Sequence, residues 1–376
     1  MMKKMPKKLA LSLGLAFSLD SAACAHQIQE NRILIDSLRI RDCSKLMENG
    51  IEVNFSRFGS VNHLPKCDDE VKMVAFNGVS SDAKTWALLA WELPKKEREE
   101  LIAVDLSGRS LIDGLKLQEG EINPLSIAER LEPFLDNIFE DIVSPIILTH
   151  SAGGAVGGFS GDKIKDSNGK VKDSKIIMYN PVLGATSRDV YLPSRTAPYA
   201  CKLQQAPEIL RRGAVAPKNG PIAPDLVALG KSQVTELASS TNVCLSVVGN
   251  DGRLVSEPCE QTPIKRLRRD MDEYCEGAKA YTNSVRKPGK LKEWNGKYKE
   301  VIARNSKRIT VILSTEDGVL NSKRTEDLIK REYPEINIIK TKGGHEASIS
   351  KPKNSSQALH TAINGGSYEG KMLAER

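Results

Sequence analysis

The chain has 376 residues, of which 40% are hydrophobic and 27% charged, with a formal net charge of +7 at pH 7. That length suits two domains, or one large α/β domain that carries an insertion. Aromatic residues make up only 5% of the chain, too few for a row of base-stacking side chains. Without residues 1–25, which carry four lysines and one acidic residue, 51 of the 55 basic and 47 of the 48 acidic residues remain. So small an excess of positive charge argues against a nucleic-acid-binding protein.

The N-terminal segment predicts export. Four lysines are followed by an apolar run of 11 residues at 9–19, and a small-x-small cleavage site, Ala-Cys-Ala, ends at residue 25. The run is too short to span a bilayer as a helix, so residues 1–25 read as a signal peptide of an exported bacterial protein. The mature protein is then expected to be periplasmic or secreted. Cys24 leaves an alternative open, because Ser-Ala-Ala before it resembles a lipoprotein cleavage box; a lipid on Cys24 would be the one link to a membrane.

The seven cysteines agree with an oxidising compartment. Loss or lipidation of Cys24 leaves six, enough for three disulfides. Cys43 and Cys67 are the expected local pair, since both precede the first strand of the predicted parallel sheet. The other four lie in one central region and are expected to pair among themselves: Cys201, Cys244, Cys259 and Cys275. None has the CxxC spacing typical of zinc sites or thiol redox motifs.

Short apolar strands alternate with helices in the first half of the chain. The predicted strands span residues 71–76, 101–104, 146–148 and 175–179. The predicted helices between them, with apolar residues at spacings of three and four, span residues 82–93, 124–142 and 151–159. This alternation predicts a mostly parallel α/β sheet with helices on both faces. Residues 26–70, which come before the first parallel strand, are expected to add antiparallel strands.

The alternation stops after Pro181 and resumes near residue 306. Residues 187–305 contain many prolines, four cysteines and mixed charge, which indicates an insertion. Two more strands follow the insertion, at residues 308–313 and 337–340. Two more helices lie at residues 322–333 and 355–363. The core domain is therefore expected to comprise residues 26–186 and 306–376.

A single serine, Ser151, lies where a predicted strand ends and a helix begins, in the segment Ile-Ile-Leu-Thr-His-Ser-Ala-Gly-Gly. A serine on so sharp a turn is exposed, and the helix N-terminus behind it offers N–H groups to an oxyanion. The segment resembles the Gly-x-Ser-x-Gly nucleophile elbow of the α/β-hydrolase family, with Thr149 replacing the first glycine. The resemblance runs from about residue 71 to the C-terminus, apart from the insertion.

The resemblance implies a triad in the family's order of serine, acid and histidine. Asp317 follows the predicted strand at 308–313, where the family places its acid, with Glu316 as the alternative. His345 follows the last strand in a Gly-Gly-His loop and is the expected base.

Four other histidines are weaker candidates. His26 and His63 precede the core, and His360 lies in the final helix, where a surface position is expected. His150 is adjacent to the nucleophile and is expected to point away from it.

Backbone N–H groups are the expected oxyanion donors. The run Asn77-Gly78-Val79 stands where the family often has His-Gly-x, so the resemblance assigns one donor to the N–H of Val79. The N–H of Ala152, directly after the nucleophile, is the other.

The function implied is an exported serine hydrolase that cleaves a small-molecule or lipid carboxylic ester through an acyl-enzyme, without a metal or organic cofactor. Residues 187–305 would then form a cap over the active site and set substrate choice. A peptidase or an acyltransferase with the same triad is an alternative. Thr149 and Asn77 depart from the family pattern and leave a third reading, a non-catalytic secreted or surface binding protein on a hydrolase scaffold.

Overall fold

The structure is a computed structural model, which describes residues 38–78, 83–106, 110–118, 121–183, 246–248, 254–256, 290–317, 320–345 and 351–365. Only the backbone is described for residues 246–248, 254–256 and 290–295. The expected signal peptide with Cys24, the oxyanion donor Val79 and the four central cysteines lie outside the described residues.

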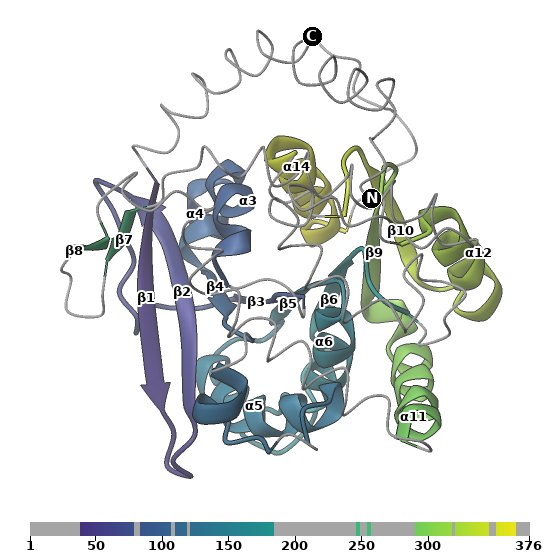
Figure 1. Cartoon of the computed structure of the whole chain (residues 1–376), viewed down its shortest axis with the longest axis horizontal. Coiled ribbons are helices and arrows are strands. Elements are labelled where there is room, and N and C mark those ends of the chain that lie inside the picture. The colour runs from purple at the N-terminus through teal and green to yellow at the C-terminus, as the bar shows by residue number, and fades with distance from the viewer. Residues whose placement is uncertain are drawn as a thin grey trace, which may run out of the picture.

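A single ten-stranded sheet forms the centre of the molecule, in the order β10-β9-β6-β5-β3-β4-β2-β1-β7-β8 (Figure 1). Its strands are β1 (Leu38–Leu46), β2 (Glu52–Ser60), β3 (Met73–Phe76), β4 (Leu101–Val104), β5 (Ile146–His150), β6 (Lys175–Tyr179), β7 (Ser246–Val248), β8 (Leu254–Ser256), β9 (Ile309–Ser314) and β10 (Asn337–Thr341). The six strands from β10 to β4 are parallel to one another. β2 is antiparallel to both β4 and β1, so residues 38–60 form the expected antiparallel segment.

Helices cover both faces of the sheet, as the strand–helix alternation predicts. They are α3 (Ala87–Glu92), α4 (Lys95–Glu99), α5 (Pro124–Ile138), α6 (Gly153–Gly161), α11 (Lys290–Arg304), α12 (Ser322–Glu332) and α14 (Pro352–Ile363). Short helical turns lie at Ala83–Trp86, Ser110–Gly114 and Ser306–Arg308. In Figure 1, α3 and α14 lie above the sheet, and α5 and α6 lie below it.

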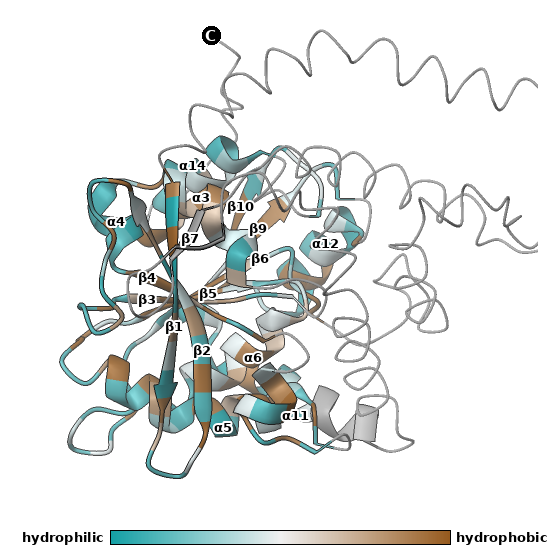
Figure 2. Ribbon diagram, turned by 60° about the vertical axis from the view of Figure 1, so that its left-hand side comes forward, coloured by the Kyte–Doolittle hydropathy of each residue, from teal (hydrophilic) through white to brown (hydrophobic). Residues whose placement is uncertain are grey.

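Alternation along the buried strands divides the apolar side chains between two cores. Val74 and Phe76 of β3 point into the core shared with α5 and α6, whereas Met73 and Ala75 point into the core shared with α3 and α14. A strand buried on both faces has to be continuously apolar, so these strands can be recognised in the sequence as short apolar runs. In Figure 2 the central strands are largely brown, whereas α4 and α12 on the outside are largely teal.

The described parts of residues 187–305 lie in the sheet and in its helix layer. β7 pairs with β1 in parallel at Arg39–Arg41, and β8 pairs with β7. α11 contacts α6, and its Tyr298 is 1% exposed against Phe159, with ring centroids 5.9 Å apart. The remainder of the expected cap lies outside the described residues.

The expected local disulfide is confirmed. Cys43 of β1 is bonded to Cys67 in the loop after β2, with Cα atoms 5.7 Å apart. The bridge fixes the loop that leads from the antiparallel strands into β3. Among the helices in the described part of the chain, none combines the length and the apolarity that crossing a bilayer requires.

Candidate active site

The predicted site residues follow the carboxyl ends of parallel strands. Ser151 comes directly after β5, and Gly78 comes two residues after β3. Asp317 comes three residues after β9, and His345 comes four residues after β10. Carboxyl ends of parallel strands meet at one edge of a sheet, where ligands bind in open α/β folds. Segments far apart in the chain therefore meet at this edge, as His150 and His345 do across 195 residues.

Ser151 is held in a strained backbone conformation. Its φ is +53°, in the left-handed region that residues with a Cβ rarely adopt. The backbone secures it on both sides: its N–H donates to Tyr179 O at 2.9 Å, and its carbonyl accepts from the N–H groups of Gly154 at 3.1 Å and Val182 at 3.3 Å. α6 begins two residues later, so the half-buried serine lies on a strand-to-helix turn.

Close backbone approach shapes the surroundings of this turn. A Cβ added to Gly78 would lie 3.2 Å from Ser151 Cβ, and one on Gly153 would lie 2.5 Å from Asn77 O. Only glycine allows the loop after β3 to lie this close to the start of α6. The side chain of Asn77 orients that loop, because Nδ2 donates to Gly78 O at 3.0 Å and Oδ1 accepts from Leu106 N at 3.1 Å.

Thr149, which replaces the first glycine of the elbow pattern, fits because of a second glycine. Gly157, about one turn into α6, lies against it, and a Cβ there would be 2.1 Å from Thr149 Cγ2. The space that the threonine needs is therefore supplied by the facing helix.

His345 and Asp317 form a buried pair. Nδ1 of His345 lies 2.9 Å from Oδ2 of Asp317, and the two side chains are 8% and 0% exposed. The second carboxylate oxygen accepts from Leu320 N at 2.8 Å. Since a carboxylate accepts, Nδ1 carries the proton and Nε2 carries the lone pair of a base. Glu316, the alternative acid, is exposed, and its backbone N–H donates to Gly343 O at 3.0 Å.

The other predicted residues have different surroundings. Ala152 is the half-buried N-cap residue of α6, so its N–H belongs to the first turn of that helix. His360 lies exposed on α14, as expected, with Nδ1 2.8 Å from Glu97 Oε1. His150 does not face solvent. It is 5% exposed, and its ring centroid lies 4.8 Å from that of His345.

The sequence reasoning missed one residue at this edge and underestimated another. Asn180 directly follows β6, is 1% exposed and has a φ of +42°. Its Nδ2 lies 2.9 Å from His345 O, and Nε2 of His150 lies 3.0 Å from the same oxygen. The signal for Asn180 was the dipeptide Asn-Pro at a strand end, which indicates a turn but names no partner.

Within the described residues, no group of three or more histidine, cysteine, aspartate or glutamate side chains is arranged to hold a metal ion.

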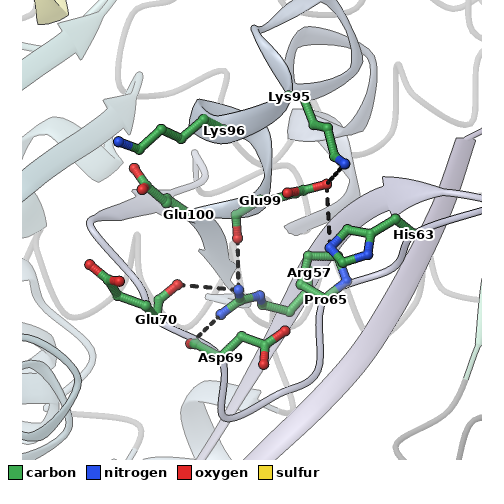
Figure 3. Close-up of a pocket in the computed structure, with 9 residues that line it drawn as sticks. All are labelled: Arg57, His63, Pro65, Asp69, Glu70, Lys95, Lys96, Glu99 and Glu100. Atoms are coloured by element: carbon green, nitrogen blue, oxygen red, sulfur yellow. Dashed lines mark hydrogen bonds and ion pairs between the residues drawn. The ribbon is translucent and has the colours of Figure 1, made fainter.

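A separate pocket of about 480 Å³ lies at the opposite, amino ends of β3 and β4 (Figure 3). Arg57, fully buried, donates there to the carbonyl oxygens of Asp69 at 3.0 Å, Glu70 at 3.3 Å and Glu99 at 2.7 Å. Burial lowers the pKa of Arg57 to about 10, and the neighbouring carboxylates oppose that shift. Because all three partners are backbone carbonyls, Arg57 connects the loops at this end of the sheet. It is not part of the site at the carboxyl ends.

No protein-family model and no curated protein matches the sequence. Among solved structures, the chain is similar to the haloalkane dehalogenase DbeA from Bradyrhizobium elkani USDA94, with 12% identity and a TM-score of 0.53 over 87% of this chain and 98% of that one. It is also similar to an N-acyl homoserine lactonase, with 12% identity and a TM-score of 0.49 over 90% and 99%. A membrane phospholipase A gives 16% identity and a TM-score of 0.47 over 95% and 96%.

The strand order, the helix layers and the likeness to the dehalogenase agree on one fold. The chain therefore has the α/β-hydrolase fold, as its sequence resemblance predicts.

Proposed function

We propose that the chain is an exported serine hydrolase that cleaves carboxylic esters through an acyl-enzyme on Ser151. The observation that carries the proposal is the buried hydrogen bond of 2.9 Å between His345 and Asp317 at the sheet edge where Ser151 occupies its strained turn. A nucleophile, a base and an acid that orients the base are the parts that acyl transfer by serine requires.

In the proposed mechanism, Ser151 Oγ attacks the ester carbonyl while Nε2 of His345 takes the hydroxyl proton. Asp317 stabilises the resulting imidazolium through Nδ1. The N–H groups of Ala152 and Val79 are assigned to the oxyanion. Collapse of the tetrahedral intermediate releases the alcohol, which receives the proton from His345. Water then attacks the acyl-enzyme with the same base, giving the carboxylic acid and free Ser151.

The two departures from the family pattern are compatible with catalysis. Thr149 has its space from Gly157, so it does not prevent the elbow from forming. Asn77 differs from the family's histidine in its side chain, whereas an oxyanion donor in this loop is a backbone N–H. These points favour an enzyme over a non-catalytic binding protein.

A fluorophosphonate probe tests the proposal on the full-length, oxidised protein. We expect labelling of the wild type, loss of labelling in Ser151→Ala, and retention in Ser126→Ala, a matched serine substitution on α5. Absence of labelling in folded wild type would instead support the binding protein.

Substrate class needs a second assay. Nitrophenyl esters with short and long acyl chains, tested beside an aminoacyl nitroanilide, separate an esterase from a lipase and from a peptidase. Transfer of the acyl group to an added alcohol would identify an acyltransferase. We expect ester hydrolysis to dominate.

Export and the cap belong to the same proposal. Mass spectrometry of the mature N-terminus distinguishes cleavage after residue 25 from a lipidated Cys24. The undescribed remainder of residues 187–305 is assigned to a cap, and its exchange should alter acyl-chain preference while leaving probe labelling of Ser151 intact.

A further inference from the structure

The backbone carbonyl of His345 lies within hydrogen-bond distance of two buried side chains. Asn180 Nδ2 is 2.9 Å and His150 Nε2 is 3.0 Å from this oxygen. The donors come from different strands: His150 is the last residue of β5, and Asn180 directly follows β6. All three residues are at most 6% exposed. The proposed base is thus held through its backbone as well as through its ring.

Hydrogen-bond chemistry fixes the orientation of both donors. Oδ1 of Asn180 accepts from Ser314 N at 2.8 Å, so its NH₂ group is the side that faces His345. The same NH₂ also donates to Ser314 Oγ at 2.9 Å. A carbonyl oxygen can only accept, so Nε2 of His150 carries a proton.

The backbone of the segment that leads to His345 has further contacts, such as the hydrogen bond of 3.0 Å from Glu316 N to Gly343 O. The segment is rich in glycine, and Gly343 has a φ of +128°, a conformation that other residues rarely adopt. The hydrogen bond to Asp317 sets the direction of the His345 ring. That bond leaves the backbone position of His345 to be set by other contacts. The two N–H donors supply such contacts from the carboxyl ends of β5 and β6, two adjacent strands of the sheet.

We infer that Asn180 and His150 are positioning residues for His345, which hold its backbone so that the imidazole stays in register with Ser151. This inference rests on the proposed hydrolase function. A base displaced by about 1 Å can lose roughly 100-fold in rate while substrate binding is little changed. The expected signature is therefore a fall in kcat at nearly constant KM.

Three variants of the positioning pair provide the test. His150→Phe keeps a planar ring and removes the donor, whereas His150→Gln restores an N–H at similar reach. Asn180→Asp keeps the acceptor for Ser314 N and removes the donor, in a residue type that tolerates a positive φ. We expect His150→Phe and Asn180→Asp to lower kcat by roughly 10- to 100-fold with little change in KM, and His150→Gln to recover most of the loss.

Ser314→Ala is the matched control. It removes one partner of the Asn180 NH₂ group and leaves both donors to His345 in place, so it should lower the Tm with kcat close to that of wild type. Wild-type kcat in folded His150→Phe and Asn180→Asp would overturn the inference, as would a His150→Gln variant no better than His150→Phe. If Asn180→Asp does not fold, the kcat values of His150→Phe and His150→Gln alone test the inference.

Failure of the proposed function has a different signature, because wild type and Ser151→Ala would then be equally inactive. In that case ¹⁵N NMR of the His150 ring still tests the geometry. A proton on Nε2, with a cross-hydrogen-bond coupling to the His345 carbonyl, supports it. A neutral His150 protonated only on Nδ1 would contradict it.

Discussion

The methyl group of Thr149 occupies the space that a Cβ atom on Gly157 would need, since the two would lie 2.1 Å apart. β5 and α6 therefore pack closely because the larger Thr149 on the strand faces the smaller Gly157 on the helix. Gly157→Ala should destabilise folding by about 1–3 kcal/mol, because the backbone has to shift to admit the methyl group. Chemical denaturation of the two proteins measures this difference.

A double-substitution cycle distinguishes this contact from ordinary helix propensity. Thr149→Ser removes the methyl group, so Gly157→Ala should cost much less in that background. Gly296 on α11 is the matched control, because a Cβ added there would meet no atom within 4 Å. Gly296→Ala should stabilise the protein by about 0.5–1 kcal/mol, as alanine does in a helix. Equal costs of Gly157→Ala in both backgrounds would contradict the proposed fit.

Asp317→Asn should lower kcat by about 10⁴-fold, since the amide no longer holds the required tautomer of His345 or stabilises the imidazolium. Steady-state kinetics with the best ester substrate provide the measurement. Glu316→Gln changes the same functional group one residue away on an exposed side chain, and should leave kcat within about twofold of wild type. The reverse result would move the acid to Glu316.

Removal of the Cys43–Cys67 bridge should lower the free energy of unfolding by about 3 kcal/mol, because the bridge closes a loop with a sequence separation of 24. The double variant with serine at both positions, compared with wild type in urea, measures the effect. A reductant should reproduce the loss in wild type. If the reductant also lowers the stability of the double variant, that loss must come from cysteines other than this pair.

Burial raises the pKa of Tyr179 well above its usual value of 10. Above pH 10 the unfolded chain releases this proton and the folded protein keeps it, so stability falls as the pH rises. In Tyr179→Phe the free energy of unfolding should fall less steeply above pH 10, by up to about 1.4 kcal/mol per pH unit. Unfolding measured between pH 9 and pH 11.5 tests it. Parallel pH profiles for both proteins would exclude the role of Tyr179.

The parallel strands could be predicted because they are buried on both faces and so read as unbroken apolar runs. β7 and β8 could not be, since each has three residues and β7 pairs with β1 about 200 positions away. α11 lies in the segment interpreted as an insertion, although Tyr298, Val301 and Ile302 carry a helical spacing that indicates its buried face.

The site residues likewise divide into those that the sequence could predict and one that it could not. Ser151, Asp317 and His345 could be proposed because each comes shortly after a legible strand, in an order that one superfamily uses. The role of Asn180 depends on a backbone carbonyl 165 residues later in the chain. Any residue has such a carbonyl, so no pattern of side chains in the sequence could reveal this contact.

Arg57 donates to the carbonyl groups of Asp69 and Glu70, in the loop that also carries Cys67. A guanidinium with a pKa of about 10 stays charged whether the surroundings are reducing or oxidising. The loop is thus docked by a contact that needs no oxidant, and Cys67 can approach Cys43 while both are still thiols. Oxidation would then secure a conformation that the chain has already reached, so the pairing of Cys43 with Cys67 does not have to be found by shuffling among the cysteines.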